Sequence, residues 1–217
     1  MDDDERRRDV YERTHDPSRV LALSDGVFAI VMTLLVLEIH VPELRGGQTL
    51  RVALQEVRPS FVAFLISFVV VAISWAGHRD LFAHVRRTDR SLVWLNILYL
   101  LPLSILPFGA ALISRYESDP VALTMYGTLL VLMALTRLAM WLYATGRRPH
   151  LLYKGMDAQA RRYGIAIIAG PAVLNLIAVL IAHEMPQASL VIYGTVPVLY
   201  FLSILVSRSS VPPELAE

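Results

Sequence analysis

An acidic side chain near the start of an apolar stretch is the first feature of this sequence that could do chemistry. Asp25 stands between Ser24 and Gly26, in a run with no other charged residue between Arg19 and Glu38. If this run crosses a membrane, a carboxylate there is energetically costly and normally finds a partner. Candidate partners are polar residues that we expect at the cytoplasmic ends of their own helices: Arg19, Trp75, His78 and Asn96. Such a cluster either contacts a transported ion or only holds helices together, and residue types alone leave both open.

Beyond Asp25, five residues share one stripe of the same helix if each residue advances it by about 100°. They are Gly26, Ile30, Thr33, Leu34 and Leu37. In a water-filled pore, rings of Ile and Leu would form a hydrophobic constriction that gates by dewetting, and Thr hydroxyls would offer ligands to a cation. Ordinary helix packing is the alternative interpretation, and the residue types favour it until another observation is added.

No grouping of residues points to an enzyme. The chain has no cysteine, and its six histidines are scattered without an H-E-x-x-H motif. An intramembrane enzyme would need a nucleophile–base pair or a metal cluster. A Thr-Val-Gly-Tyr-Gly loop is also absent, which excludes a carbonyl-lined ion filter. We therefore expect a protein that is not an enzyme, with no cofactor and no metal beyond a permeating cation.

The composition indicates that helices in a lipid bilayer position these residues. The 217-residue chain is 55% hydrophobic and 18% charged, whereas soluble domains carry about 25% charge. A helix needs about 20 mostly apolar residues to cross a bilayer. Six stretches meet this requirement: Val20–Ile39, Ser60–Gly77, Ser91–Ser114, Val121–Thr145, Tyr163–Ala182 and Ala188–Ser207. The sequence therefore predicts an all-α integral membrane protein with six transmembrane helices.

The basic residues predict the orientation of these helices. Of the 20 Lys and Arg residues, 15 lie on the side that holds both termini and four on the other. Because basic loops stay in the cytoplasm, both termini are expected there. We divide the chain into a cytoplasmic tail (residues 1–18), a six-helix membrane domain (19–208) and a disordered cytoplasmic tail (209–217). No feature indicates binding to nucleic acid.

Arg137 is the one basic residue inside an expected span. An arginine at a helix centre costs about 3 kcal/mol on insertion scales. It lies about two turns from the cytoplasmic end, so we expect its side chain to extend toward the interface. A contact to Asp25 or to a lipid phosphate is the alternative. Prolines also occur within the spans and are expected to be kinks that shape packing: Pro102, Pro107, Pro171 and Pro197.

Two blocks of sequence resemble a known family. RVLALSDG at residues 19–26 is similar to the R-x-x-x-F-S-D-G signature of the transmembrane protein 175 family of potassium channels. The second block comprises WAGHRDLF from Trp75, LVWLN from Leu92 and LPF from Leu106. Together they cover residues 19–113 in order. Leu23 departs from the signature's Phe, and Arg79 follows His78 where many members have a second histidine.

The resemblance implies a prokaryotic member of the family in the cell membrane. It implies a homotetramer of four copies around a central pore lined by the first helix, with membrane lipids and monovalent cations as its other partners. The narrow hydrophobic ring maps to Ile30, with Thr33, Leu34 and Leu37 outward of it. The structural polar network maps to Arg19, Ser24, Asp25, Trp75, His78 and Asn96.

On this basis we expect passive K+ conduction, weakly selective over Na+. Selectivity would come from the ring at Ile30 and from the hydroxyl of Thr33, near which K+ would lie. Glu38 would raise the local cation concentration at the outer mouth, although a carboxylate solvated at the interface explains it equally well. Two alternatives stay open: a proton-permeable channel in which His78 or Asp25 relays protons, and a secondary transporter for a small cation.

Overall fold

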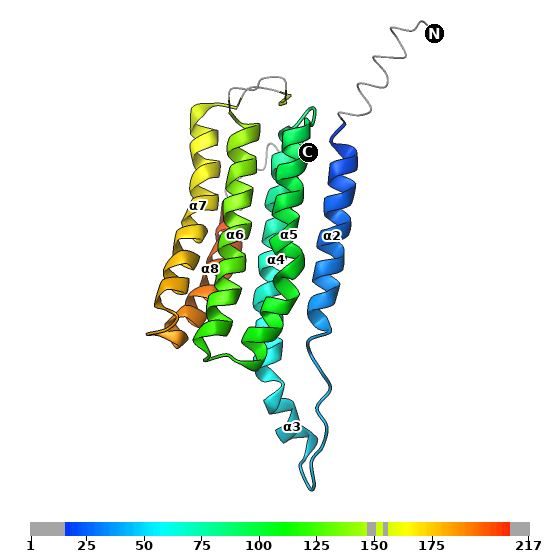
Figure 1. Ribbon diagram of the computed structural model, residues 1–217, viewed down its shortest axis with the longest axis vertical. Helices are drawn as coiled ribbons and strands as arrows, with labels where there is room; N and C mark the ends of the chain where they lie inside the picture. The colour runs from blue at the N-terminus through cyan, green and yellow to red at the C-terminus, as the bar shows by residue number, and fades with distance from the viewer. Residues whose placement is uncertain (1–15, 147–150, 154–155, 209–217) are drawn as a thin grey trace, which may run out of the picture.

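The computed structural model describes residues 16–146, 151–153 and 156–208, with side chains described through Leu199. Six long helices lie side by side in one bundle, and a short one projects beyond its end (Figure 1). Their bounds are α2 Ser18–Val36, α3 Leu50–Glu56, α4 Arg58–His84, α5 Arg90–Arg115, α6 Pro120–Ala144, α7 Ala158–Ile181 and α8 Pro186–Arg208. Of the two expected tails, residues 1–15 and 209–217 lie outside the described residues.

Among the described residues, five helices are long and apolar enough to cross a membrane: α2, α4, α5, α6 and α7. They coincide with the first five predicted spans, and the sixth predicted stretch falls within α8. The prolines predicted to lie inside spans are inside helices, two in α5 and one each in α7 and α8. The all-helical membrane architecture is therefore confirmed.

Three differences from the prediction concern α4, α3 and α2. α4 continues from Gly77 to His84, because buried Leu81 and Phe82 keep one face of the helix apolar beyond the hydrophobic run. The first connection contains the helix α3, for which the sequence carries no span-like signal. α2 ends at Val36, so Glu38 lies in a turn after the helix rather than in its last turn.

Aspartates begin three of the helices. The carboxylates of Asp89, Asp119 and Asp157 accept backbone N–H donors at the N-termini of α5, α6 and α7, over 2.6–2.8 Å. These contacts satisfy donors that have no partner inside the helix. Asp89 also accepts a hydrogen bond of 2.7 Å from the Tyr143 hydroxyl, which ties α5 to α6. These acidic residues therefore define helix ends.

A backbone contact joins two basic connections at one end of the bundle. Val85 forms an isolated antiparallel bridge with Leu152, and the Arg86 N–H donates to the Leu151 carbonyl over 2.7 Å. These residues belong to the α4–α5 and α6–α7 connections. The charge distribution predicts that these two connections lie on the same side of the membrane, and the contact places both at the same end of the bundle.

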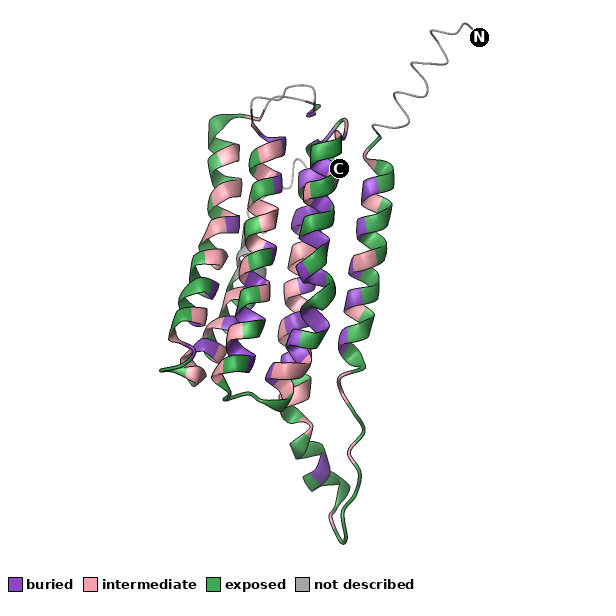
Figure 2. Cartoon of the chain, viewed as in Figure 1, coloured by how far each residue is buried: buried purple, intermediate pink, exposed green. Residues whose placement is uncertain are grey.

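α2 packs into the bundle with a single face. Its buried residues recur every three or four positions and contact α4 and α5: Val20, Ser24, Phe28, Val31 and Leu35. Most of the remaining surface of α2 is exposed (Figure 2). α2 is thus held at the edge of the bundle with a long face that no other described helix contacts.

Gly127 of α6 leaves space for side chains from both α7 and α8. A Cβ at this position would overlap the hydroxyl of Tyr193 and a methyl group of Val179. Tyr193 is fully buried, and its hydroxyl donates to the Leu123 carbonyl over 3.1 Å. We expect Gly127→Ala to destabilise the protein by about 1–3 kcal/mol through overpacking, measured by unfolding the purified protein in mixed micelles.

The matched control for this prediction is Gly170→Ala in α7, where no atom lies within 4 Å of the added Cβ. This change should be neutral or stabilise by up to about 1 kcal/mol, since alanine favours a helix more than glycine does. Equal effects of the two substitutions would contradict the packing at Gly127.

Candidate functional site

Three buried polar residues from three helices form a continuous hydrogen-bonded chain. The His78 Nε2–H donates to Asn96 Oδ1 over 2.7 Å, and Asn96 Nδ2 donates to Ser24 Oγ over 2.9 Å. The Ser24 hydroxyl donates to the Val20 carbonyl over 2.8 Å. All three side chains are at most 1% exposed. Because Asn96 offers an acceptor, the histidine takes the tautomer with its proton on Nε2.

Aromatic rings surround His78 on several sides. Its ring stacks on Phe82 with centroids 4.6 Å apart and on Tyr99 at 5.9 Å. Phe28 lies tilted against it at 5.7 Å. Sequence analysis missed these rings, although each lies one turn after a network residue: Phe28 after Ser24, Phe82 after His78 and Tyr99 after Asn96. The i to i+3 or i+4 spacing is the signal that could have found them.

Asp25 lies outside this buried chain, although it follows Ser24 in sequence. It is exposed, and its Oδ1 accepts a hydrogen bond of 2.8 Å from Trp75 Nε1. The Arg79 guanidinium lies over the Trp75 ring, 5.3 Å from its centroid. Arg19 is exposed and makes no hydrogen bond or ion pair within the described chain. The predicted network is thus two clusters, with Arg19 in neither.

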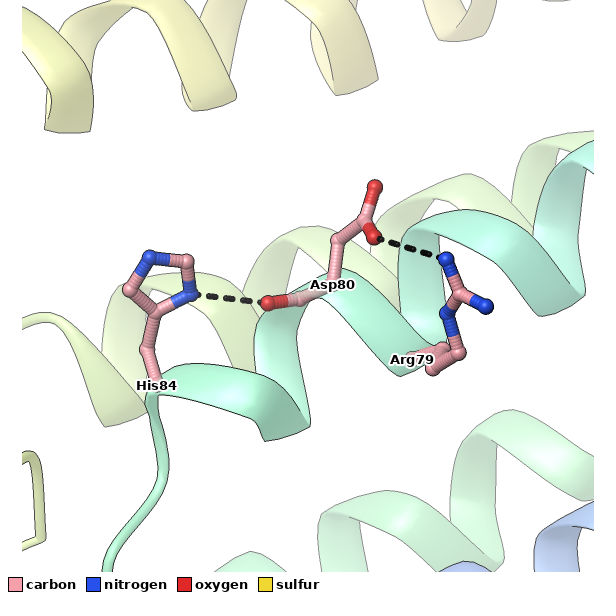
Figure 3. A network of polar contacts seen from close by, with 3 residues as sticks. All are labelled: Arg79, Asp80 and His84. Atoms are coloured by element: carbon pink, nitrogen blue, oxygen red, sulfur yellow. Dashed lines mark hydrogen bonds and ion pairs between the residues drawn. The ribbon is translucent and has the colours of Figure 1, made fainter. Parts of the chain in front are cut away.

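Arg79 occupies the position at which many family members were expected to have a second histidine. It lies at the surface of α4 beside Asp80, with 3.9 Å between Nη2 and Oδ1, and the two side chains are 60% and 71% exposed. One turn farther along α4, the Nδ1 atom of His84 is 2.8 Å from the backbone carbonyl oxygen of Asp80 (Figure 3). Exposed ion pairs contribute little to stability. The departure from the signature therefore leaves the buried network untouched.

The predicted stripe of α2 faces away from the bundle along its whole length. Ile30 is 59% exposed, Leu34 41% and Leu37 65%, and Gly26 has no atom within 4 Å of where a Cβ would stand. Leu37 follows the last helical residue but keeps helical dihedral angles, so it continues the stripe. These residues lie opposite the anchoring face, and no contact with the part of the chain that the structure describes explains them.

Thr33 lies on the same face, and a hydrogen bond within α2 fixes the direction in which its hydroxyl proton points. The hydroxyl donates to the Ile30 carbonyl of its own helix over 2.8 Å. Because the proton is used within the helix, the lone pairs of Oγ1 stay available on the exposed side. Glu38, past the end of α2, is half-buried, and its carbonyl lies 3.1 Å from His40 Nδ1.

The guanidinium of Arg137 packs against Gly77 of α4, where a Cβ would overlap it. Gly77 and Arg137 each lie seven residues before the end of their helix. The guanidinium therefore lies at about the same depth in the bundle as the backbone of Arg137, next to α4. The expectation that this side chain extends toward the interface is wrong.

Comparison with known proteins identifies relatives of this chain. The family model "Endosomal/lysosomal potassium channel TMEM175" matches residues 19–107. Potassium channel B446_29190 of Streptomyces collinus is 40% identical over 152 residues, which are 68% of this chain and 73% of that protein. The human endosomal/lysosomal proton channel TMEM175 is 36% identical over 142 residues, 58% of this chain and 28% of the human protein.

A solved structure shares the fold. It is the crystal structure of a lysosomal potassium-selective channel TMEM175 homolog from Chamaesiphon minutus, with a TM-score of 0.76 and 29% sequence identity. The similarity covers 89% of this chain and 98% of that one. Together with the helices long enough to cross a membrane, these matches identify a multi-pass membrane protein. The chain belongs to the TMEM175 family of potassium channels.

Proposed function

We propose that this protein is a passive potassium channel, weakly selective over sodium, whose pore is lined by α2. The observation that carries the proposal is the exposed face of α2, with Ile30, Thr33, Leu34 and Leu37 in one line. The relatives named potassium channels and the potassium-selective solved homolog support the same function. The observation also favours a pore over simple packing, because nothing in the described part of the chain packs against this face.

The same proposal includes the assembly and its orientation. Four copies would surround the pore, each contributing one α2, with α8 as the sixth span and both termini in the cytoplasm of a prokaryotic cell. The likeness to a solved potassium-selective channel and the excess of basic residues at one end of the bundle support this arrangement. Lipids would cover the apolar surfaces turned away from the pore.

In this mechanism the ring of Ile30 side chains is the narrowest point. Water leaves a narrow apolar ring readily, so an ion must shed part of its hydration shell to pass. Na+ loses more hydration energy than K+ in doing so, which gives a modest preference for K+. The free lone pairs of Thr33 would replace part of the lost hydration one turn farther out, and Glu38 would concentrate cations at the outer mouth.

The test is ion flux through the purified protein in liposomes that contain K+ or Na+, with a pH-sensitive dye as readout. We expect dye quenching from K+-loaded vesicles only after a protonophore is added, and moderately weaker quenching from Na+-loaded vesicles. Quenching before the protonophore would show that protons pass, as the name of the human relative implies for that protein. Flux that requires an imposed proton gradient would instead indicate a transporter.

Asp25→Asn tests whether the carboxylate on the proposed pore helix, α2, is needed. Asparagine keeps the oxygen that accepts from Trp75 Nε1, so we expect K+ flux and stability close to those of the original protein. Trp75→Phe, which removes the donor, should lower the free energy of unfolding by about 1 kcal/mol. If Asp25→Asn abolishes flux in a protein that unfolds normally, the carboxylate acts on the ion itself.

A further inference from the structure

A cavity of about 90 Å³ lies inside the helix bundle, away from the exposed face of α2. Its walls come from α4, α5, α6, α7 and α8, and no residue of α2 contributes to them. The lining residues include Val70 of α4 and Pro197 of α8, each near the middle of its helix. Most of the wall is apolar, so its few polar groups stand out.

The first of these polar groups is the charged side chain of Arg137. It lines the cavity, and no hydrogen bond or ion pair to it is found among the described residues. Gly77 makes room for the guanidinium, since any side chain at that position would overlap it. A positive charge held within the membrane region is costly without a counter-charge or hydrogen-bond acceptors. The described bundle supplies the space but no anion.

The second polar group is the side-chain amide of Asn175, which is only 7% exposed. Its Oδ1 is buried and has no hydrogen-bond partner among the described residues, and the residue belongs to the wall of the same cavity. Pro171, also in the wall, removes the N–H that the carbonyl of Ile167 would otherwise accept from. The cavity therefore holds a positive donor together with acceptors that need a hydrogen.

We propose that this cavity binds a small monovalent anion together with water. The anion accepts from the Arg137 guanidinium and neutralises it, and its hydration water fills the rest of the cavity beside Asn175. A cation is excluded by the arginine, and a cavity of about 90 Å³ has room for one small ion and a few waters. The site is separate from the proposed pore and does not depend on it.

The test measures the thermal unfolding midpoint of the full-length protein in nanodiscs. Chloride replaces gluconate stepwise at constant K+ and constant ionic strength. Because an anion that binds only the folded protein stabilises it in proportion to the logarithm of its concentration above Kd, the midpoint should rise with log chloride. Nitrate and hydrogen carbonate should act as chloride does, since both are small, whereas gluconate should not.

Two substitutions make this test specific. Arg137→Gln should remove the dependence on chloride, whereas Arg162→Gln, which removes an exposed arginine at the start of α7, should keep it. Asn175→Asp places a carboxylate in the same cavity as the guanidinium. It should unfold at a midpoint at least as high as that of the original protein and be indifferent to chloride.

Equal midpoints in chloride and gluconate for the unchanged protein would overturn the proposal, as would a chloride effect that survives in Asn175→Asp. If Arg137→Gln fails to fold, Asn175→Asp decides between the outcomes, because it adds a counter-charge instead of removing a charge. Neither readout involves K+ flux, so a failure here leaves the channel proposal standing, and a failed flux experiment leaves the anion site standing.

Discussion

Replacing Ile30 with asparagine should raise cation flux and weaken the preference for K+ over Na+. A ring of amides holds water where a ring of isoleucines expels it, so ions would keep more of their hydration while passing. We expect K+ flux to rise about tenfold, the change that follows from lowering the barrier by about 1.4 kcal/mol. Na+ flux should rise by more, because the apolar ring holds Na+ back more strongly. Both are measured in the liposome assay.

The control for this prediction is Leu132→Asn in α6. Leu132 is 43% exposed, lies at the middle of its helix and belongs to an element that does not pack on α2. It introduces the same polar group at a similar depth, but on a surface that would face lipid. Flux should stay unchanged in this variant. If Ile30→Asn leaves both flux and selectivity as they were, the constriction is not at Ile30.

Asn96→Leu should cause the largest loss of stability of any single change in the buried network. Leucine removes the acceptor of the His78 Nε2–H and the donor to Ser24 Oγ, 2.7 and 2.9 Å away. A buried polar group without a partner costs about 1–3 kcal/mol, and the histidine ring is enclosed by aromatic rings. We expect about 2–4 kcal/mol less free energy of unfolding in mixed micelles.

A double substitution separates the lost hydrogen bond from lost packing. In His78→Phe/Asn96→Leu no imidazole is left unpaired, and phenylalanine can stack on Phe82 and Tyr99 as the histidine does. The double variant should therefore be more stable than the sum of the single effects predicts. Ser104→Ala, which removes a hydroxyl bonded only to its own helix, should have little effect. Strict additivity would show that the network is not coupled.

Hydropathy and helical periodicity were enough to predict the helices and the face of α2 that carries Ile30. Apolar length marks a span because lipid cannot satisfy backbone groups outside a helix. The spacing of Ile30, Thr33, Leu34 and Leu37 places them on one stripe of any α-helix, whatever surrounds it. The structure adds that this stripe is the exposed one, which residue types could not decide.

The partners of individual polar residues were not predictable in the same way. Asp25 and Ser24 are neighbours in sequence, yet one bonds to Trp75 and the other to Asn96. Consecutive residues point about 100° apart, and which partner each meets depends on how α4 and α5 are rotated about their own axes. The position of the Arg137 guanidinium depends on one such detail, the absence of a side chain at Gly77. No single-helix pattern contains this information.

The order of groups in the buried chain decides whether it could serve as a proton wire. A wire needs each member to take a proton on one side and release another from its far side, as water, hydroxyls and imidazoles do. The chain has a carboxamide, Asn96, between His78 and Ser24. A carboxamide nitrogen holds its protons at neutral pH, and the chain ends on the Val20 carbonyl, which has no proton to pass on. Hopping along this route would stop at the amide, so a proton that crosses this protein does not travel along the His78–Asn96–Ser24 chain.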